Sequence, residues 1–217
     1  MKKLAQMECY RLLHTPRLIA LLLGLIVASI LGTCTHVSTS MDSMAQFYGI
    51  LGDERYLGFF ATLIGAYYYC MDYQNRTYSP AVCRGYGRGQ IYAAKLVGYL
   101  LLTTVISTVS ALLSVLITVE NLRSLDAGLV AGKLALRVCF DLRIWAVPPV
   151  LAHLFRKLVP AILAGFACGF LFLTSSSSNI TRLLSAEQRW LFAVGSLALM
   201  VAAAWIGYAL FRRVDLK

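Results

Sequence analysis

The sequence predicts an all-α membrane protein with about six transmembrane helices, preceded by an amphipathic helix at the membrane surface. The 217 residues are 59% hydrophobic and only 14% charged, with a mean hydropathy of +0.70, whereas soluble domains carry about 25% charged residues. Several apolar runs approach the roughly 20 residues that a helix needs to cross about 30 Å of hydrocarbon. Lys and Arg residues gather between these runs, mainly on one side of the predicted membrane.

The predicted elements form a single transmembrane domain, residues 1–217. Residues 1–16 form the surface helix, whose apolar side chains recur at helical spacing, namely Ala5, Cys9, Leu12 and Leu13. Pro16 separates this helix from the first span, which we expect to be retained rather than cleaved as a signal peptide. The predicted spans are 17–33, 55–72, 95–119, 128–154, 158–174 and 189–211. A polar, basic segment, 73–94, joins the second span to the third.

The distribution of basic residues predicts the orientation. With the N-terminus in the cytoplasm and six spans, 13 Lys and Arg residues fall in cytoplasmic segments and 4 fall outside, as the positive-inside rule requires. Five spans would place the basic C-terminus on the opposite side. We therefore expect both termini in the cytoplasm. The net charge of +10 then reflects contact with anionic lipid headgroups, and no nucleic-acid partner is expected.

The fourth predicted span is unusual because it carries charge. Lys133, Arg137 and Asp141 follow at intervals of four and share a helix face, and a lone charge at mid-bilayer costs about 2.5–3.5 kcal/mol. Two interpretations stay open. Either Arg137 and Asp141 pair on a helix that faces a hydrated cleft, or residues 127–143 lie at the membrane surface and the membrane part bends at the Pro-Pro pair that follows.

Hydroxyl and small side chains recur at helical spacing in other spans. The third span carries a hydroxyl stripe, Thr103, Ser107, Ser110 and Ser114. This stripe either lines a polar path or bonds to neighbouring helices. The second and fifth spans carry ridges of small residues, Ala61 with Gly65 and Ala161 with Gly165 and Gly169. Such ridges favour close helix packing, within one chain or between two.

The sequence lacks the patterns that indicate catalysis or metal binding. The six cysteines are scattered singly, and no Gly-x-x-x-x-Gly-Lys-[Ser/Thr] phosphate loop occurs. We therefore expect no catalytic residue, metal or cofactor on this chain, so any work from ATP must come from another polypeptide. Tyrosines gather at the end of the second span, Tyr67, Tyr68, Tyr69 and Tyr73, where we expect them to anchor the helix at the lipid headgroups.

Residues 72–95 interrupt the apolar chain with a basic, aromatic and turn-rich segment. This segment resembles the one in permease subunits of type-2, exporter-class ATP-binding-cassette transporters, which runs from an acidic residue through a Gly-Thr, a short cytoplasmic helix, a Ser-Arg and a hydrophobic pair to a Lys. The matching residues are Asp72, Thr77, Gly87-Arg88, Ile91-Tyr92 and Lys95. Arg76 replaces the Gly before the Thr, and Gly85-Tyr86 stands where the family commonly has Pro. The general plan resembles that of small permeases for peptide-antibiotic export and immunity.

The resemblance implies that a short coupling helix within residues 74–90 sits in a groove of a separate cytosolic ATPase, which binds the ATP and Mg. The coupling residues would be Asp72, Arg76, Thr77, Tyr78, Arg84, Tyr86, Arg88 and Lys95. A second permease subunit, identical or related, would complete the path. Residues that either line this path or only pack would be Thr103, Ser107, Ser110, Ser114, Arg137 and Asp141.

The function that the resemblance implies is ATP-driven export of an amphipathic or hydrophobic substrate, such as a peptide antibiotic or a drug, across the bacterial cytoplasmic (inner) membrane. The alternative is a membrane scaffold or regulatory subunit that transports nothing. In that case the hydroxyl stripe and the charged helix serve only for packing.

Overall fold

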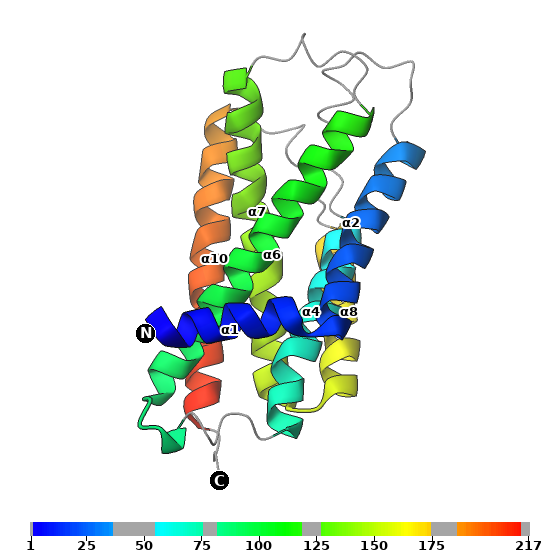
Figure 1. The fold of residues 1–217 in the computed structure, drawn as a ribbon. Helices are drawn as coiled ribbons and strands as arrows, with labels where there is room; N and C mark the ends of the chain where they lie inside the picture. The colour runs from blue at the N-terminus through cyan, green and yellow to red at the C-terminus, as the bar shows by residue number, and fades with distance from the viewer. Residues whose placement is uncertain (1, 37–54, 76–81, 119–126, 175–185, 214–217) are drawn as a thin grey trace.

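The computed structural model describes residues 2–36, 55–75, 82–118, 127–174 and 186–213, and within these ranges all regular structure is helical (Figure 1). The helices are α1 (Lys2–His14), α2 (Pro16–His36), α4 (Arg55–Gln74), α6 (Arg88–Thr118), α7 (Ala127–Phe155), α8 (Leu158–Thr174) and α10 (Ala186–Arg212). The prediction of an all-α chain is thus confirmed for the part of the chain that the structure describes. In Figure 1, α1 lies across the bundle while the other helices run along it.

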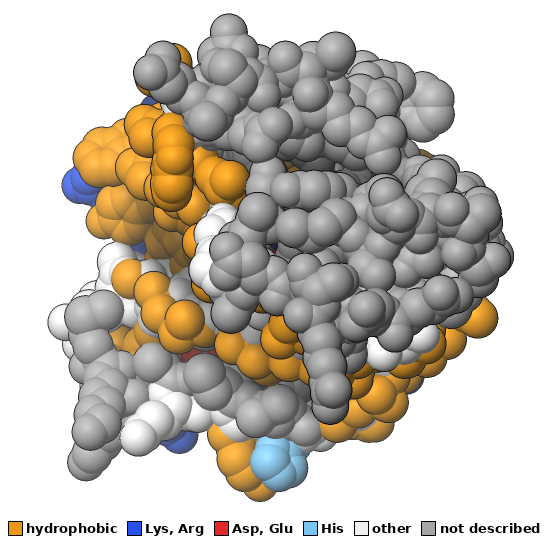
Figure 2. Space-filling model, turned by 90° about the horizontal axis from the view of Figure 1, so that it is seen from above, with side chains coloured by type: hydrophobic (Ala, Val, Ile, Leu, Met, Phe, Trp, Pro, Cys, Tyr) orange, Lys and Arg blue, Asp and Glu red, His pale blue; other side chains and the backbone are white. Residues whose placement is uncertain are grey.

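Three of the described helices are long and apolar enough to cross a membrane: Arg88–Ile117, Val130–Phe155 and Trp190–Arg212. Shorter apolar helical stretches cover Pro16–Ala28 and Leu158–Cys168. Large apolar side chains on α6 and α10 face outward, among them Leu101, Leu116, Leu191 and Trp205. Figure 2 shows hydrophobic side chains over much of the described surface in that view. Such a surface is typical of a membrane protein.

The core of the bundle forms around α4, which contacts α2, α7 and α8. Its side chains Ile64 and Tyr69 are buried together with Leu25 of α2 and Trp145 of α7. Gly65 permits the close approach of α7, because a Cβ atom there would overlap Pro148 and lie 2.8 Å from the Tyr99 hydroxyl.

The small-residue ridges lie at these helix contacts. Ala61 and Gly65 are buried in α4, and Ala161 and Gly165 are buried in α8. A Cβ atom on Gly165 would overlap Thr62 of α4. The sequence left open whether these ridges pack within one chain or between two. The described structure shows that these four residues allow close packing inside one chain.

The link between α4 and α6 is shorter than predicted. Helix α4 continues to Gln74, and α6 begins at Arg88, seven residues before the predicted third span. The first turn of α6 starts where the Gln90 side chain accepts a hydrogen bond from the Gly87 amide at 3.2 Å, the arrangement of a helix N-terminus. Before it, Gly85 has a φ of 83°, which glycine adopts without strain. Residues 76–81, which belong to the segment predicted to hold the coupling helix, lie outside the described residues.

Helix α7 is continuous through Pro148 and Pro149, from Ala127 to Phe155. Residues 127–143 therefore belong to the same helix as the apolar residues that follow, which is unlike the interpretation of a separate surface helix. A tight turn then joins α7 to α8: Arg156 adopts the left-handed conformation, with a φ of 56°, and its amide donates to the Ala152 carbonyl at 2.9 Å.

Candidate functional site

The described structure brings Asp72 and Lys95 into a buried ion pair. Asp72 lies near the end of α4 and Lys95 in the second turn of α6, and their side chains are 6% and 1% exposed. A third charge reaches the same carboxylate from α1, where the Arg11 guanidinium lies 2.8 Å from both Asp72 oxygens. The carboxylate thus joins three helices at the lower end of the bundle in Figure 1, where α4 and α10 end and α6 begins.

Two further residues complete this cluster, which we call the charge joint: Glu8, Arg11, Tyr68, Asp72 and Lys95. The Tyr68 hydroxyl donates to Glu8 at 2.6 Å, and Arg11 lies 3.5 Å from the same Glu8 oxygen. The Lys95 ammonium donates to the Tyr68 carbonyl at 3.3 Å and lies 4.4 Å from the centre of the Tyr68 ring. Two acids balance two bases, so the joint is neutral when all four groups are ionised.

Neutrality and close contact explain how the charges tolerate burial. An isolated ion in an apolar interior is strongly disfavoured, whereas paired ions whose remaining donors and acceptors are satisfied persist. Lys95 has an opposite charge, a carbonyl and the faces of two tyrosine rings around it. Separating α1, α4 and α6 would expose or unpair these charges. The joint therefore favours movement of the three helices as one unit.

A second cluster lies beside the joint, around His153 of α7. The Tyr73 hydroxyl and His153 Nδ1 share a 2.5 Å hydrogen bond, and the His153 ring packs against Tyr69, Tyr92 and Phe211. Tyr92 reaches α10, where its hydroxyl donates to the Ala204 carbonyl at 2.9 Å. This cluster connects α4, α6, α7 and α10.

The interpretation of the tyrosines as headgroup anchors is wrong for two of them. Tyr68 and Tyr69 are 2% and 0% exposed, in the core of the bundle. Tyr67 and Tyr73 are partly buried and pack against the core clusters. The physical reason is that the three consecutive residues Tyr67, Tyr68 and Tyr69 cannot all face outward on one helix, since successive residues point about 100° apart.

The other predicted coupling residues take different positions. Arg84 is exposed in the turn before α6. Tyr86 is partly buried against the small core of Leu4, Ile91, Tyr92, Ala94 and Phe211. Arg88 donates to the Arg212 carbonyl at 2.7 Å, which ties the start of α6 to the end of α10. Arg76, Thr77 and Tyr78 lie outside the described residues.

The hydroxyl stripe is buried inside the chain. Thr103, Ser107, Ser110 and Ser114 are each 1% exposed. Ser107 donates to Asp141 of α7 at 2.5 Å, and Thr103 donates to the Tyr99 carbonyl of its own helix at 2.8 Å. The Ser110 and Ser114 hydroxyls have no hydrogen-bond partner among the described residues. The stripe faces the interior of the chain, where Ser107 contacts α7.

Arg137 and Asp141 are also close, as their spacing indicates. The Arg137 Nε lies 3.6 Å from the Asp141 carboxylate, and the two residues are 7% and 1% exposed. They share this contact with Ser107 of α6. Because the pair is buried, the described structure does not place it on an open face. The Lys133 side chain is outside the described residues.

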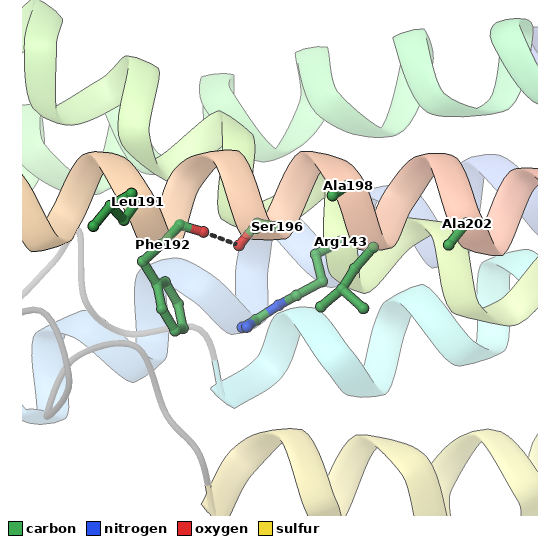
Figure 3. A pocket seen from close by; sticks show the side chains of 8 residues that line it. Arg143, Leu191, Phe192, Ser196, Ala198 and Ala202 are labelled. Atoms are coloured by element: carbon green, nitrogen blue, oxygen red, sulfur yellow. Dashed lines mark hydrogen bonds between the residues drawn. The ribbon is translucent and has the colours of Figure 1, made fainter.

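An open groove with a volume of about 730 Å³ lies beside Arg143 of α7, along one exposed face of α10 (Figure 3). Its wall is apolar along α10, from Leu191 to Ala202, apart from Ser196. The Ser196 hydroxyl donates to the Phe192 carbonyl at 2.9 Å. In Figure 3 the Arg143 side chain extends along α10 toward Phe192, and its guanidinium carbon lies 5.5 Å from the centre of the Phe192 ring.

Sequence reasoning missed Glu8, Arg11, Tyr68 and His153. A signal for the first two is present, because Leu4, Glu8 and Arg11 recur at i, i+4 and i+7 and so share one face of α1. That face packs against the bundle, with Leu4 and Glu8 buried. The side chains of the predicted apolar stripe, Ala5, Cys9, Leu12 and Leu13, are outside the described residues.

The described residues contain no group of three or more His, Cys, Asp or Glu side chains placed to hold a metal ion. Comparison of the chain with protein-family models and with curated proteins found no match.

Proposed function

We propose that the protein is a membrane-spanning permease subunit of an ATP-driven exporter in the bacterial cytoplasmic membrane. Its six spans are α2, α4, α6, α7, α8 and α10, with both termini in the cytoplasm and α1 at the cytoplasmic surface. A separate cytosolic ATPase binds ATP and Mg. The path for an amphipathic or hydrophobic substrate forms between this chain and a second permease subunit.

The observation that carries the proposal is the charge joint beside the α4–α6 link. The link joins two helices that are paired through Asp72 and Lys95. A force applied to the link therefore reaches α4 and α6 together, and Arg11 connects α1 to the same point. This arrangement suits a part that receives movement from outside and passes it to the spans.

Further contacts connect the α4–α6 link to the other helices of the bundle. Arg88 bonds to the end of α10, and Tyr92 packs against His153 of α7. Closure of two ATPase subunits around ATP displaces the link, and the packed helices carry the displacement to the path between the two permease subunits. The apolar outer surfaces of α6 and α10 suit a substrate that enters from the bilayer.

Arg84 is the residue on which to test ATPase docking. It is exposed in the link, whereas Tyr86 packs against the core and Arg88 bonds to Arg212. Changes at Tyr86 or Arg88 would therefore disturb the fold as well as any docking. Arg84→Glu reverses an exposed charge, with Arg213→Glu as the matched control, because Arg213 is also exposed at this end of the bundle.

The experiment is co-expression of the tagged chain with a candidate cytosolic ATP-binding-cassette ATPase, followed by purification and measurement of the ATPase recovered. We expect Arg84→Glu to weaken the association by roughly tenfold or more, because reversed charges at an interface repel. Arg213→Glu should leave it unchanged. Equal recovery with the native chain and both variants would contradict docking through the link. Failure of any such ATPase to co-purify would favour the scaffold or regulatory subunit.

A further inference from the structure

The turn between α7 and α8 places two exposed basic side chains between two apolar helices. The helix Val130–Phe155, which is long and apolar enough to cross a membrane, ends directly before Arg156, and the apolar helical stretch Leu158–Cys168 begins directly after Lys157. Both basic side chains are exposed, and neither forms a hydrogen bond or an ion pair with the described part of the chain. The turn lies at the lower end of the bundle in Figure 1. If α7 crosses the bilayer, these two charges lie at the membrane surface.

Large apolar side chains flank the two charges. Leu154 and Phe155 are 54% and 39% exposed, and Val159 is 67% exposed. Exposed apolar side chains next to basic ones are typical of a segment at the boundary between the acyl chains and the headgroups, because the long basic side chains reach the phosphates while the apolar ones stay in the hydrocarbon. Arg84 of the α4–α6 link differs, since no large apolar side chain is exposed among its neighbours in residues 82–86.

The backbone at Arg156 suits glycine better than arginine. Its φ of 56° lies in the left-handed region, which glycine adopts without the steric penalty that a Cβ atom brings. The Arg156 amide closes the end of α7 on the Ala152 carbonyl, a position that glycine usually occupies. The turn itself therefore does not require an arginine, and the exposed side chain indicates a contact outside the fold.

The charge left on the described surface is positive. The acidic side chains whose burial the structure describes are Glu8, Asp72 and Asp141, and each is at most 7% exposed. The exposed basic side chains in the same described ranges are Arg17, Arg84, Arg156, Lys157, Arg212 and Arg213. No described acidic side chain on the surface can neutralise the α7–α8 turn, so the charge complementary to it comes from another molecule.

We propose that residues 154–159, which we call the basic turn, bind an anionic phospholipid such as phosphatidylglycerol. The lipid phosphate accepts hydrogen bonds from Arg156 and Lys157, and the exposed apolar side chains of the turn contact the acyl chains. Phosphatidylcholine carries the same phosphate, but its choline cation offsets the attraction to two basic side chains, so the turn prefers the anionic lipid. The binding requires only that the chain lies in a membrane, and it is independent of the proposed transport function.

The test measures which lipid lies beside the basic turn in a bilayer. Phe155→Trp adds a fluorophore at the turn, and the signal of the native chain, which has three tryptophans, is subtracted. The chain is reconstituted into phosphatidylcholine vesicles with a small share of phosphatidylglycerol, and one of the two lipids carries brominated acyl chains, which quench tryptophan on contact. We expect a preference for phosphatidylglycerol of more than about tenfold, because each basic side chain contributes about fivefold. Quenching in proportion to the share of each lipid would overturn the proposal.

Variants of the Phe155→Trp chain then locate the site. Arg156→Gly and Lys157→Gln should each reduce the preference about fivefold. Arg84→Gln is the matched control, because Arg84 is also exposed at this end of the bundle, and it should leave the preference unchanged. Equal effects of all three changes would mean that the preference reflects the overall charge of the chain, and would overturn the assignment to the basic turn.

Arg156→Gly also separates lipid binding from a role in the fold. Glycine suits the left-handed conformation at this position, so the unfolding temperature in pure phosphatidylcholine, followed by circular dichroism, should not fall. A lower unfolding temperature with an unchanged lipid preference would show that Arg156 only supports the turn, and the proposal would fail.

An acidic protein surface in place of the lipid would give a different result. If Arg156→Gly and Lys157→Gln keep the lipid preference and instead abolish recovery of the co-expressed ATPase, the basic turn binds the ATPase and the lipid proposal fails. A preference that survives roughly 1 M sodium chloride would also contradict it, because salt screens exposed charges. An Arg156-dependent preference in a chain that associates with no ATPase would refute the proposed transport function and still support the lipid site.

Discussion

Asp72 holds two basic side chains that differ in their access to water, and this difference predicts how variants of the charge joint will behave. The Lys95 side chain is 1% exposed, whereas that of Arg11 is 34% exposed. Asp72→Asn leaves Lys95 buried without its carboxylate and should destabilise the protein by about 3–5 kcal/mol. Lys95→Met should cost less, because Asp72 keeps Arg11. Thermal unfolding of the detergent-solubilised variants, monitored by tryptophan fluorescence, shows which variant loses more stability.

The combination of both changes provides the control. Asp72→Asn with Lys95→Met removes the buried charges of both partners, so its cost should be smaller than the sum of the single costs. Strictly additive costs, or a larger effect of Lys95→Met than of Asp72→Asn, would contradict an ion pair between the two side chains.

The sequence predicted where Asp72 and Lys95 lie, but their partners could not be found from it. Both residues bracket a turn-rich segment between two apolar helices, which places them at one end of the bundle. The contact of Asp72 with Arg11 depends on how α1 crosses the bundle, and a hydropathy pattern does not contain a crossing angle. The Arg137–Asp141 contact was predictable, because one helix turn fixes it.

Glycines at helix contacts and glycines on open faces should respond to substitution in opposite directions. A Cβ atom on Gly65 of α4 would overlap Pro148 of α7, whereas one on Gly132 of α7 would meet nothing within 4 Å. Gly65→Ala should therefore lower stability by about 1–3 kcal/mol through overpacking. Gly132→Ala should raise it by up to about 1 kcal/mol through helix propensity. Midpoints of thermal unfolding measure both, and a stabilised Gly65→Ala would show that α4 and α7 do not approach as described.

Helix ends were harder to predict than helix positions, as α6 illustrates. The predicted third span began at Lys95 because a charge usually marks the end of a span. The structure extends α6 back to Arg88, since Ile91, Tyr92 and Ala94 bury themselves against Leu4 and Phe211. Lys95 can then lie inside the helix because Asp72 pairs with it. The apolar residues of this first part of α6 can be read from the local sequence. The side chains that cover them come from α1 and α10, which are distant in the sequence, so the start of the helix could not be predicted.

Side chains fill the described interior of the chain, and this restricts where a substrate of the proposed transporter could pass. Trp145, Tyr69, Tyr99 and Leu25 are fully buried in the middle of the bundle. The hydroxyl stripe, for which the sequence left a polar path and helix packing open, is buried within the same chain, and its Ser107 bonds to Asp141 of α7. A path through the centre of one chain would need these packed groups to separate, at a cost of several kcal/mol for each large side chain exposed. The proposed transport therefore calls for a path along the outer surface of the chain.

We accordingly expect the transporting complex to contain two permease subunits, with the path between them. We co-express two differently tagged copies of the chain with the ATPase. If the second subunit is identical, the two tagged copies should co-purify; if it is not, a single tagged copy should co-purify with a related permease. The mass of the complex in nanodiscs, measured by mass photometry, distinguishes one permease subunit from two. ATP-dependent movement of substrate by a complex with a single copy would contradict this expectation, because the packed interior described above would then have to open.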